Sequence, residues 1–108
     1  MPGLTKNSKR DFDIDDIIDR VCGYLDVPTK MVYRRSREHQ YVLARQISMY
    51  LIKKKTNMTL KSIGEKFNRD HTSVIHSITS INNYIFTKDE QVINAISNIQ
   101  SKLLINNN

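Results

Sequence analysis

The chain has 108 residues and a formal net charge of +6, with 39% hydrophobic and 26% charged side chains. This length and composition fit one folded globular domain with a modest core and exclude an extended disordered protein. No apolar stretch approaches the roughly 20 residues of a membrane span, and the N-terminus lacks the apolar core of a secretory signal, so we expect no membrane span and a cytoplasmic location.

The first predicted helix covers residues 13–25. Before it, residues 1–11 show no periodicity and carry basic side chains, so we expect a flexible basic arm there. Apolar residues then recur at helical spacing, and aspartates in the first turn suit the helix dipole. The apolar set is Ile14, Ile17, Ile18, Val21, Cys22 and Leu25. Cys22 has no second cysteine to pair with, so a buried structural role is favoured over a reactive thiol.

A second long helix is predicted over residues 38–55. Pro28 ends the first helix, and residues 28–31 suit a short helical turn, which a basic loop at 33–37 follows. Three lysines at the end of the second helix complement its dipole. The apolar residues of this helix are Leu43, Ala44, Ile47, Tyr50 and Leu51.

Positive charge is concentrated between residues 30 and 55. Eight basic side chains stand there against one acid, Glu38, for a local charge of +7, whereas residues 11–26 hold six aspartates against Arg20. The eight are Lys30, Arg34, Arg35, Arg37, Arg45, Lys53, Lys54 and Lys55. Such a patch is typical of phosphate-backbone binding, although a solvated helix face and loop would have the same composition.

Residues 59–86 have the pattern of a helix-turn-helix. Thr59 is a suitable N-cap for a short helix over 59–67, and after a tight turn Asp70 can cap a longer helix. The apolar residues of the longer helix are Val74, Ile75, Ile78, Ile81 and Ile85. We expect Ile75 and Ile78 to face the core and the opposite face to be small and polar.

A last helix follows residues 88–90 and completes the domain. Its apolar residues are Val92, Ile93, Ile96, Ile99, Leu103 and Leu104. With no alternating strand pattern, the sequence predicts an all-α, compact bundle of about five helices with a central helix-turn-helix. We expect the domain to cover residues 12–105 and the tail at 106–108 to fray.

In a helix-turn-helix the N-terminal turn of the second helix enters the major groove. The residues suited to reach base edges are Arg69, Asp70, His71, Thr72, Ser73 and His76. Aspartate accepts from cytosine, while histidine and threonine bond to base or phosphate oxygens. The two histidines are about 140° apart around a helix, unlike an i, i+4 ligand pair, so we expect no metal and no cofactor; simple exposed polar residues are the alternative.

Four sequence runs point to one family. The runs are Arg34-Arg35-Ser36-Arg37, residues 44–51, residues 60–64 and residues 69–76. In this order and spacing the chain resembles the C-terminal DNA-binding domain (domain IV) of the bacterial replication initiator DnaA, over roughly residues 12–104. The resemblance implies a Trp-repressor-like fold and sequence-specific binding of double-stranded DNA at a replication-origin (DnaA-box-like) site, in association with the nucleoid.

The resemblance also implies individual roles. Asp70, His71 and Thr72 match base contacts in the major groove, Ser73 and His76 lie just beyond them, and Arg37 matches an arginine that enters the minor groove. The implied DNA backbone contacts are Arg34, Arg35, Arg45, Gln46, Leu60, Lys61 and Arg69. The departures from the family pattern are Asn68 for one or two glycines, Ala44 for a frequent proline and His39 for a frequent basic residue.

Glycine occurs only at positions 3, 23 and 64, so we expect no phosphate-binding glycine loop and no nucleotide site. The chain is then either a domain of an initiator or a stand-alone protein, and we expect a monomer on DNA. The alternatives are a protein-interaction adaptor or a transcription regulator that kept the fold. We expect no enzyme, because the carboxylates of the first helix have no histidine or cysteine partner.

Overall fold

The computed structural model describes the backbone of residues 12–106 and the side chains of residues 12–103. The predicted arm at 1–11, the end of the tail at 107–108 and the side chain of Leu104 lie outside these ranges. The described chain is all-α, which confirms the predicted fold class. Its elements are α1 (Ile14–Leu25), the 3₁₀ helix η2 (Thr29–Tyr33), α2 (His39–Lys55), α3 (Leu60–Lys66), α4 (His71–Phe86) and α5 (Glu90–Asn106).

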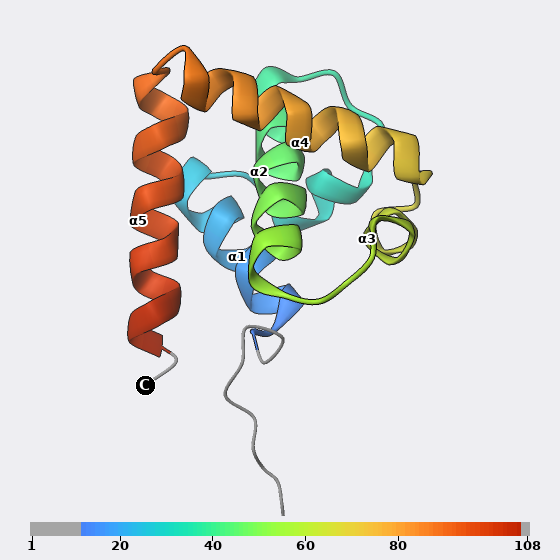
Figure 1. The fold of residues 1–108 in the computed structure, drawn as a ribbon, viewed down its shortest axis with the longest axis horizontal. Helices are drawn as coiled ribbons and strands as arrows, with labels where there is room; N and C mark the ends of the chain where they lie inside the picture. Colours follow the sequence, from blue (N-terminus) through green and yellow to red (C-terminus); the bar gives the residue numbers. More distant parts are fainter. Residues whose placement is uncertain (1–11, 107–108) are drawn as a thin grey trace, which may run out of the picture.

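Helix α2 lies at the centre of the bundle (Figure 1). It contacts α1, η2, α3 and α4, while α5 packs against α1 and the end of α4. The largest fully buried side chains are Phe67, Ile17, Ile18, Leu43, Ile47, Met49, Leu51, Ile52, Ile63, Ile81, Ile99 and Leu103. Cys22 is also buried, as predicted, and burial raises the pKa of its thiol to about 11. In the part of the chain described, no helix has the length and apolarity to cross a membrane.

The helix boundaries follow from local capping. The helices α1, α2, α3 and α4 each begin and end within one residue of the bounds predicted from the sequence. Three helices end at a non-glycine residue with positive φ: Asp26 (59°), Asn68 (59°) and Lys88 (63°). The N–H that follows each of them donates to a carbonyl five residues earlier, which satisfies the otherwise unpaired end of the helix. Such ends stop a helix sharply and redirect the chain.

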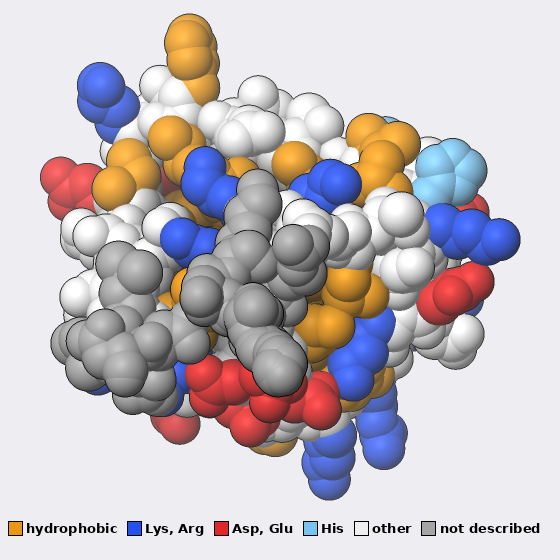
Figure 2. All heavy atoms as spheres, turned by 60° about the horizontal axis from the view of Figure 1, so that its bottom comes forward, with side chains coloured by type: hydrophobic (Ala, Val, Ile, Leu, Met, Phe, Trp, Pro, Cys, Tyr) orange, Lys and Arg blue, Asp and Glu red, His pale blue; other side chains and the backbone are white. Residues whose placement is uncertain are grey.

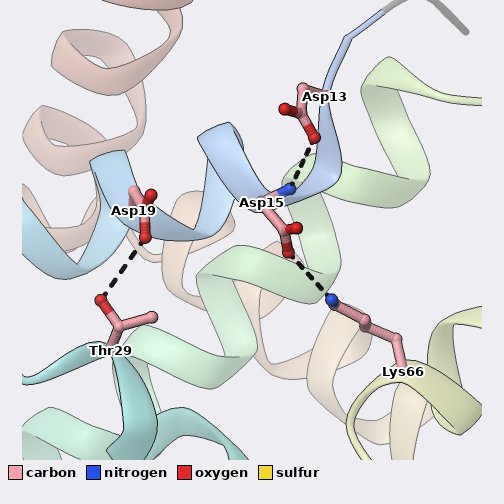
Figure 3. Close-up of polar contacts among 5 residues, drawn as sticks. All are labelled: Asp13, Asp15, Asp19, Thr29 and Lys66. Carbon is pink, nitrogen blue, oxygen red and sulfur yellow. Dashed lines mark hydrogen bonds and ion pairs between the residues drawn. The ribbon is translucent and has the colours of Figure 1, made fainter.

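The acidic residues of α1 hold neighbouring elements in place. Asp13 caps the helix by accepting from the N–H of Asp15 at 3.1 Å (Figure 3). The carboxylate of Asp15 accepts from Lys66 of α3 at 2.9 Å, and Asp19 accepts from the hydroxyl of Thr29 at 3.5 Å. Figure 2 shows a group of acidic side chains at the lower centre of the view, with further acidic side chains apart from it at the left and right. Because exposed ion pairs contribute at most about 1 kcal/mol, these contacts orient α3 and η2 more than they stabilise the fold.

Candidate nucleic-acid interface

The turn between α3 and α4 is closed by a contact that requires glycine. The N–H of Arg69 donates to the carbonyl of Gly64 at 2.7 Å. A Cβ on Gly64 would lie 2.5 Å from the carbonyl oxygen of Arg69 and 3.2 Å from that of Asp70. Between these residues, Asn68 has φ of 59°, a conformation that asparagine tolerates better than most residues. Asn68 therefore closes this turn in a left-handed conformation without a glycine.

Both predicted N-caps of the helix-turn-helix are confirmed. The side chain of Thr59 accepts from the N–H of Ser62 at 3.0 Å, and that of Asp70 accepts from the N–H of Ser73 at 3.0 Å. The hydrogen bond from Ser73 is the main reason that the pKa of Asp70 is lowered. The caps fix where α3 and α4 begin and hold the Asp70 carboxylate at the exposed start of α4.

The start of α4 presents most of the predicted base-contact residues to solvent. Asp70, His71, Thr72 and His76 are exposed, and Ser73 is half-buried. The opposite face of the helix is anchored by buried side chains. These are Val74, Ser77 and Ile81.

One expectation for α4 is wrong: Ile75 does not face the core. Its side chain is 43% exposed, whereas Ile78 is half-buried and packs against the core as expected. Successive helical residues turn by about 100°, so a helix anchored through Val74 directs Ile75 away from α2 and α3. Ile75 instead lies one turn beyond His71, on the exposed face. Its position in the helical register is the signal that could have identified it.

Three elements bring arginines together beside the start of α4. The carbonyl of Arg34, at the end of η2, accepts from Arg69 Nη2 at 3.1 Å and from Arg45 Nη1 of α2 at 3.4 Å. Arg69 Nη1 also donates to the carbonyl of Phe67 at 3.0 Å. Burial and the nearby Arg69 lower the pKa of Arg45, while burial and the nearby Arg35 lower that of Arg69. We call Arg34, Arg35, Arg45 and Arg69 the arginine cluster.

The arginine cluster is not neutralised within the described part of the chain. The ion pairs found there join Arg20 to Asp16 and Lys66 to Asp15. The lowered pKa values of Arg45 and Arg69 indicate that burial and a neighbouring arginine disfavour the cationic form of each of these two side chains. An anion placed against the cluster would reverse this penalty.

An aromatic contact attaches the basic loop to the helix-turn-helix. The ring of Tyr33 stacks on that of Phe67 with centroids 5.5 Å apart and an interplanar angle of 26°. The ammonium of Lys66 lies 5.8 Å from the centre of the Tyr33 ring. The loop therefore leaves η2 directly beside the end of α3.

The remaining predicted contact residues lie outside these interactions. Arg37 is exposed in the loop beyond the cluster, and no described hydrogen bond joins its side chain to the others. Lys61 is exposed on α3, whereas Leu60 and Gln46 are half-buried. The structure thus brings four of the predicted backbone-contact residues together and leaves Arg37, Gln46, Leu60 and Lys61 separate from them.

This combination of fold and surface defines a helix-turn-helix DNA-binding domain. Comparison with known proteins agrees: the family model described as "Bacterial dnaA protein helix-turn-helix" matches residues 14–81. The chain belongs to this family.

Several similar proteins are named chromosomal replication initiator protein DnaA. The protein of Oleidesulfovibrio alaskensis is 33% identical over 91 residues, which are 82% of this chain and 20% of the relative. That of Caldanaerobacter subterraneus subsp. tengcongensis is 32% identical over 100 residues, 93% of this chain and 22% of the relative. That of Bacteroides thetaiotaomicron is 35% identical over 80 residues, which are 73% of this chain and 17% of the relative. The chain spans about a fifth of the length of these relatives.

Proposed function

We propose that this protein binds double-stranded DNA sequence-specifically at a replication-origin site that resembles a DnaA box. Asp70, His71 and Thr72 read base edges in the major groove with Ser73 and His76 beside them, and Arg37 enters the adjacent minor groove. Contacts to the DNA backbone come from Arg34, Arg35, Arg45, Gln46, Leu60, Lys61 and Arg69. The protein binds as a monomer in the cytoplasm, associated with the nucleoid, without enzymatic activity, cofactor or bound nucleotide.

The arginine cluster is the observation that carries this proposal. Arg45 and Arg69 are half-buried there, Arg34 and Arg35 are exposed beside them, and the ion pairs in the described chain involve none of the four. Phosphate oxygens satisfy guanidinium groups in a fixed geometry and neutralise them. Because the cluster adjoins the exposed start of α4, a phosphate backbone held there would bring base edges within reach of the recognition helix.

The arginine cluster and the start of α4 have different roles in the proposed complex with DNA. Phosphate contacts set the register of a protein on the duplex and carry no sequence information, whereas base contacts specify the site. Loss of an arginine of the cluster should therefore weaken binding to all sequences. Loss of a side chain at the start of α4 should instead reduce discrimination at one base pair.

Binding measurements on matched duplexes test the proposal. Fluorescence anisotropy should show much tighter binding to a duplex with an origin-type box than to a scrambled duplex, with each wrong base pair costing about 1–3 kcal/mol. Thr72→Ala should relax the preference at one position. Arg45→Ala should weaken both duplexes and reduce the slope of log affinity against log salt by about 0.9. Lys88→Ala, an exposed cation between α4 and α5, is the matched control and should change neither. Equal affinity for boxed and scrambled duplexes would refute sequence-specific binding.

A further inference from the structure

The carbonyl oxygen of Arg34 joins the loop at residues 34–38 to two other elements. It accepts from Arg69 Nη2, in the turn between α3 and α4, at 3.1 Å and from Arg45 Nη1 of α2 at 3.4 Å. The N–H of Arg34 donates to the carbonyl of Met31 at 3.3 Å, so both backbone polar groups of Arg34 are held. We call the two guanidinium groups and the carbonyl that they share the Arg34 clamp.

The Arg34 clamp lies three residues before Arg37, at the start of a segment that is held at both ends. The hydroxyl of Ser36 accepts from the N–H of Glu38 at 3.1 Å, which bends the backbone around Arg37. Helix α2 begins at the next residue, His39. Three residues span at most about 11 Å, so the position of the Arg37 backbone depends directly on where Arg34 is held.

The two clamping arginines keep donors for a second partner. A guanidinium group has more N–H donors than one carbonyl can use. The described hydrogen bonds use one donor of Arg45 and two of Arg69, and both side chains are only half-buried. A phosphate can therefore bind to them without breaking the clamp. It would also relieve the penalty that lowers their pKa values.

We infer that the two clamping arginines, Arg45 and Arg69, are positioning residues for Arg37. Each holds a DNA phosphate and the Arg34 carbonyl at once, and so fixes the loop relative to the DNA backbone. Breaking the clamp should therefore weaken the minor-groove contact even where the phosphate contact is kept. The inference rests on the proposed function, because it requires Arg37 to enter the minor groove.

The base 2,6-diaminopurine isolates the minor-groove contact. Paired with thymine, it has the major-groove face of adenine and adds the 2-amino group that guanine presents in the minor groove. The duplex with an origin-type box is scanned with this base, one A·T pair at a time, by fluorescence anisotropy. Where Arg37 enters, diaminopurine should weaken binding of the wild type by about tenfold, the effect of one wrong base pair. Arg37→Ala should abolish this effect.

Reversal of an A·T pair to T·A is the complementary probe. The two pairs look alike in the minor groove and differ in the major groove. The reversal therefore reports on the base contacts of the start of α4 and not on Arg37. Its effect should be the same in the wild type and in every variant of the Arg34 clamp.

Arg69→Lys breaks the clamp and keeps the charge. The diaminopurine effect should fall from about tenfold to about threefold, because one hydrogen bond is typically worth a factor of about two to ten. The slope of log affinity against log salt should not change, because the charge is kept. Arg45→Lys should act in the same direction and more weakly, since its hydrogen bond is longer. Arg20→Lys, which changes an arginine paired with Asp16 on α1, is the matched control and should change none of these effects.

The outcomes separate the inference from the proposed function. If Arg37→Ala abolishes the diaminopurine effect while both clamp variants keep it in full, the clamp does not position Arg37 and the proposed function stands. If Arg69→Lys reduces the diaminopurine and reversal effects alike, it loosens the whole interface and the inference is also wrong. If diaminopurine has no effect on the wild type, Arg37 does not read the minor groove and the inference fails. Equal binding of boxed and scrambled duplexes by the wild type would instead overturn the proposed function itself.

Discussion

The start of α4 and the loop between η2 and α2, residues 34–38, are held in place by different kinds of contact. The start of α4 depends on contacts within ten residues: the Asp70 cap, the left-handed Asn68 and the close approach of Gly64 to Arg69. The loop depends on distant residues, because Arg34 accepts from side chains 11 and 35 positions away. The start of α4 is therefore positioned by local contacts, whereas the loop that carries Arg37 is held at Arg34 by residues distant in sequence.

Gly64→Ala is expected to have the largest effect on stability, because it should disturb both the start of α4 and the loop at residues 34–38. The added Cβ would lie 2.5 Å from the carbonyl oxygen of Arg69, and Arg69 in turn holds Arg34. We expect a loss of about 3 kcal/mol in the free energy of unfolding, at the upper end of overpacking effects, measured by urea denaturation.

Gly23→Ala is the matched control for this substitution. Gly23 lies within α1, and nothing would lie within 4 Å of an added Cβ there. Alanine should stabilise the helix by about 0.5–1 kcal/mol. Similar stability changes in the two variants would show that the contact at Gly64 does not close the turn.

Arg69→Lys should loosen the loop at residues 34–38 and leave the start of α4 unchanged. Lysine keeps the positive charge but cannot reproduce the two-pronged donation to Phe67 and Arg34. We expect a loss of about 1 kcal/mol of stability, the net value of a typical hydrogen bond. Amide hydrogen exchange should become faster at residues 35–38 and stay unchanged within α4. Faster exchange in both regions would mean that the start of α4 is not set by local contacts alone.

The difference between local contacts and contacts distant in sequence also explains which features the sequence could predict. The bounds of α1 to α4, the Thr59 and Asp70 caps and the exposed Asp70–Thr72 run follow from spacing and from side chains that bond to nearby N–H groups, and these were predicted. The Asp13 cap of α1 was not. The exposure of Ile75 was missed, although its position one turn beyond His71 on the polar face was a signal that could have identified it. The convergence of Arg45 and Arg69 on the Arg34 carbonyl was also not predicted, because it joins elements far apart in sequence.

Asp70 provides a test confined to the start of α4. Its pKa is lowered below the ordinary 3.8, so the ionised form stabilises the fold above that value. This stabilisation is lost as the pH falls through the lowered pKa. Asp70→Asn should keep an N-cap and remove this part of the acid sensitivity, whereas Asp70→Ala should lose the cap at every pH. Thermal unfolding between pH 2 and 6 measures the difference, and identical pH profiles for wild type and Asp70→Asn would contradict it.

The smallest effect is expected from Asn68→Gly, which tests whether local geometry alone sets the turn. Glycine relieves the cost of a left-handed residue, about 1–2 kcal/mol for an ordinary side chain and less for asparagine. It also increases the entropy of the unfolded chain by a comparable amount, so the net change should be within about 0.5 kcal/mol. Asn68→Ala has no such compensation and should lose about 1 kcal/mol or more. If Asn68→Gly shifted DNA affinity while Asn68→Ala did not, the asparagine side chain would have a role beyond its backbone conformation.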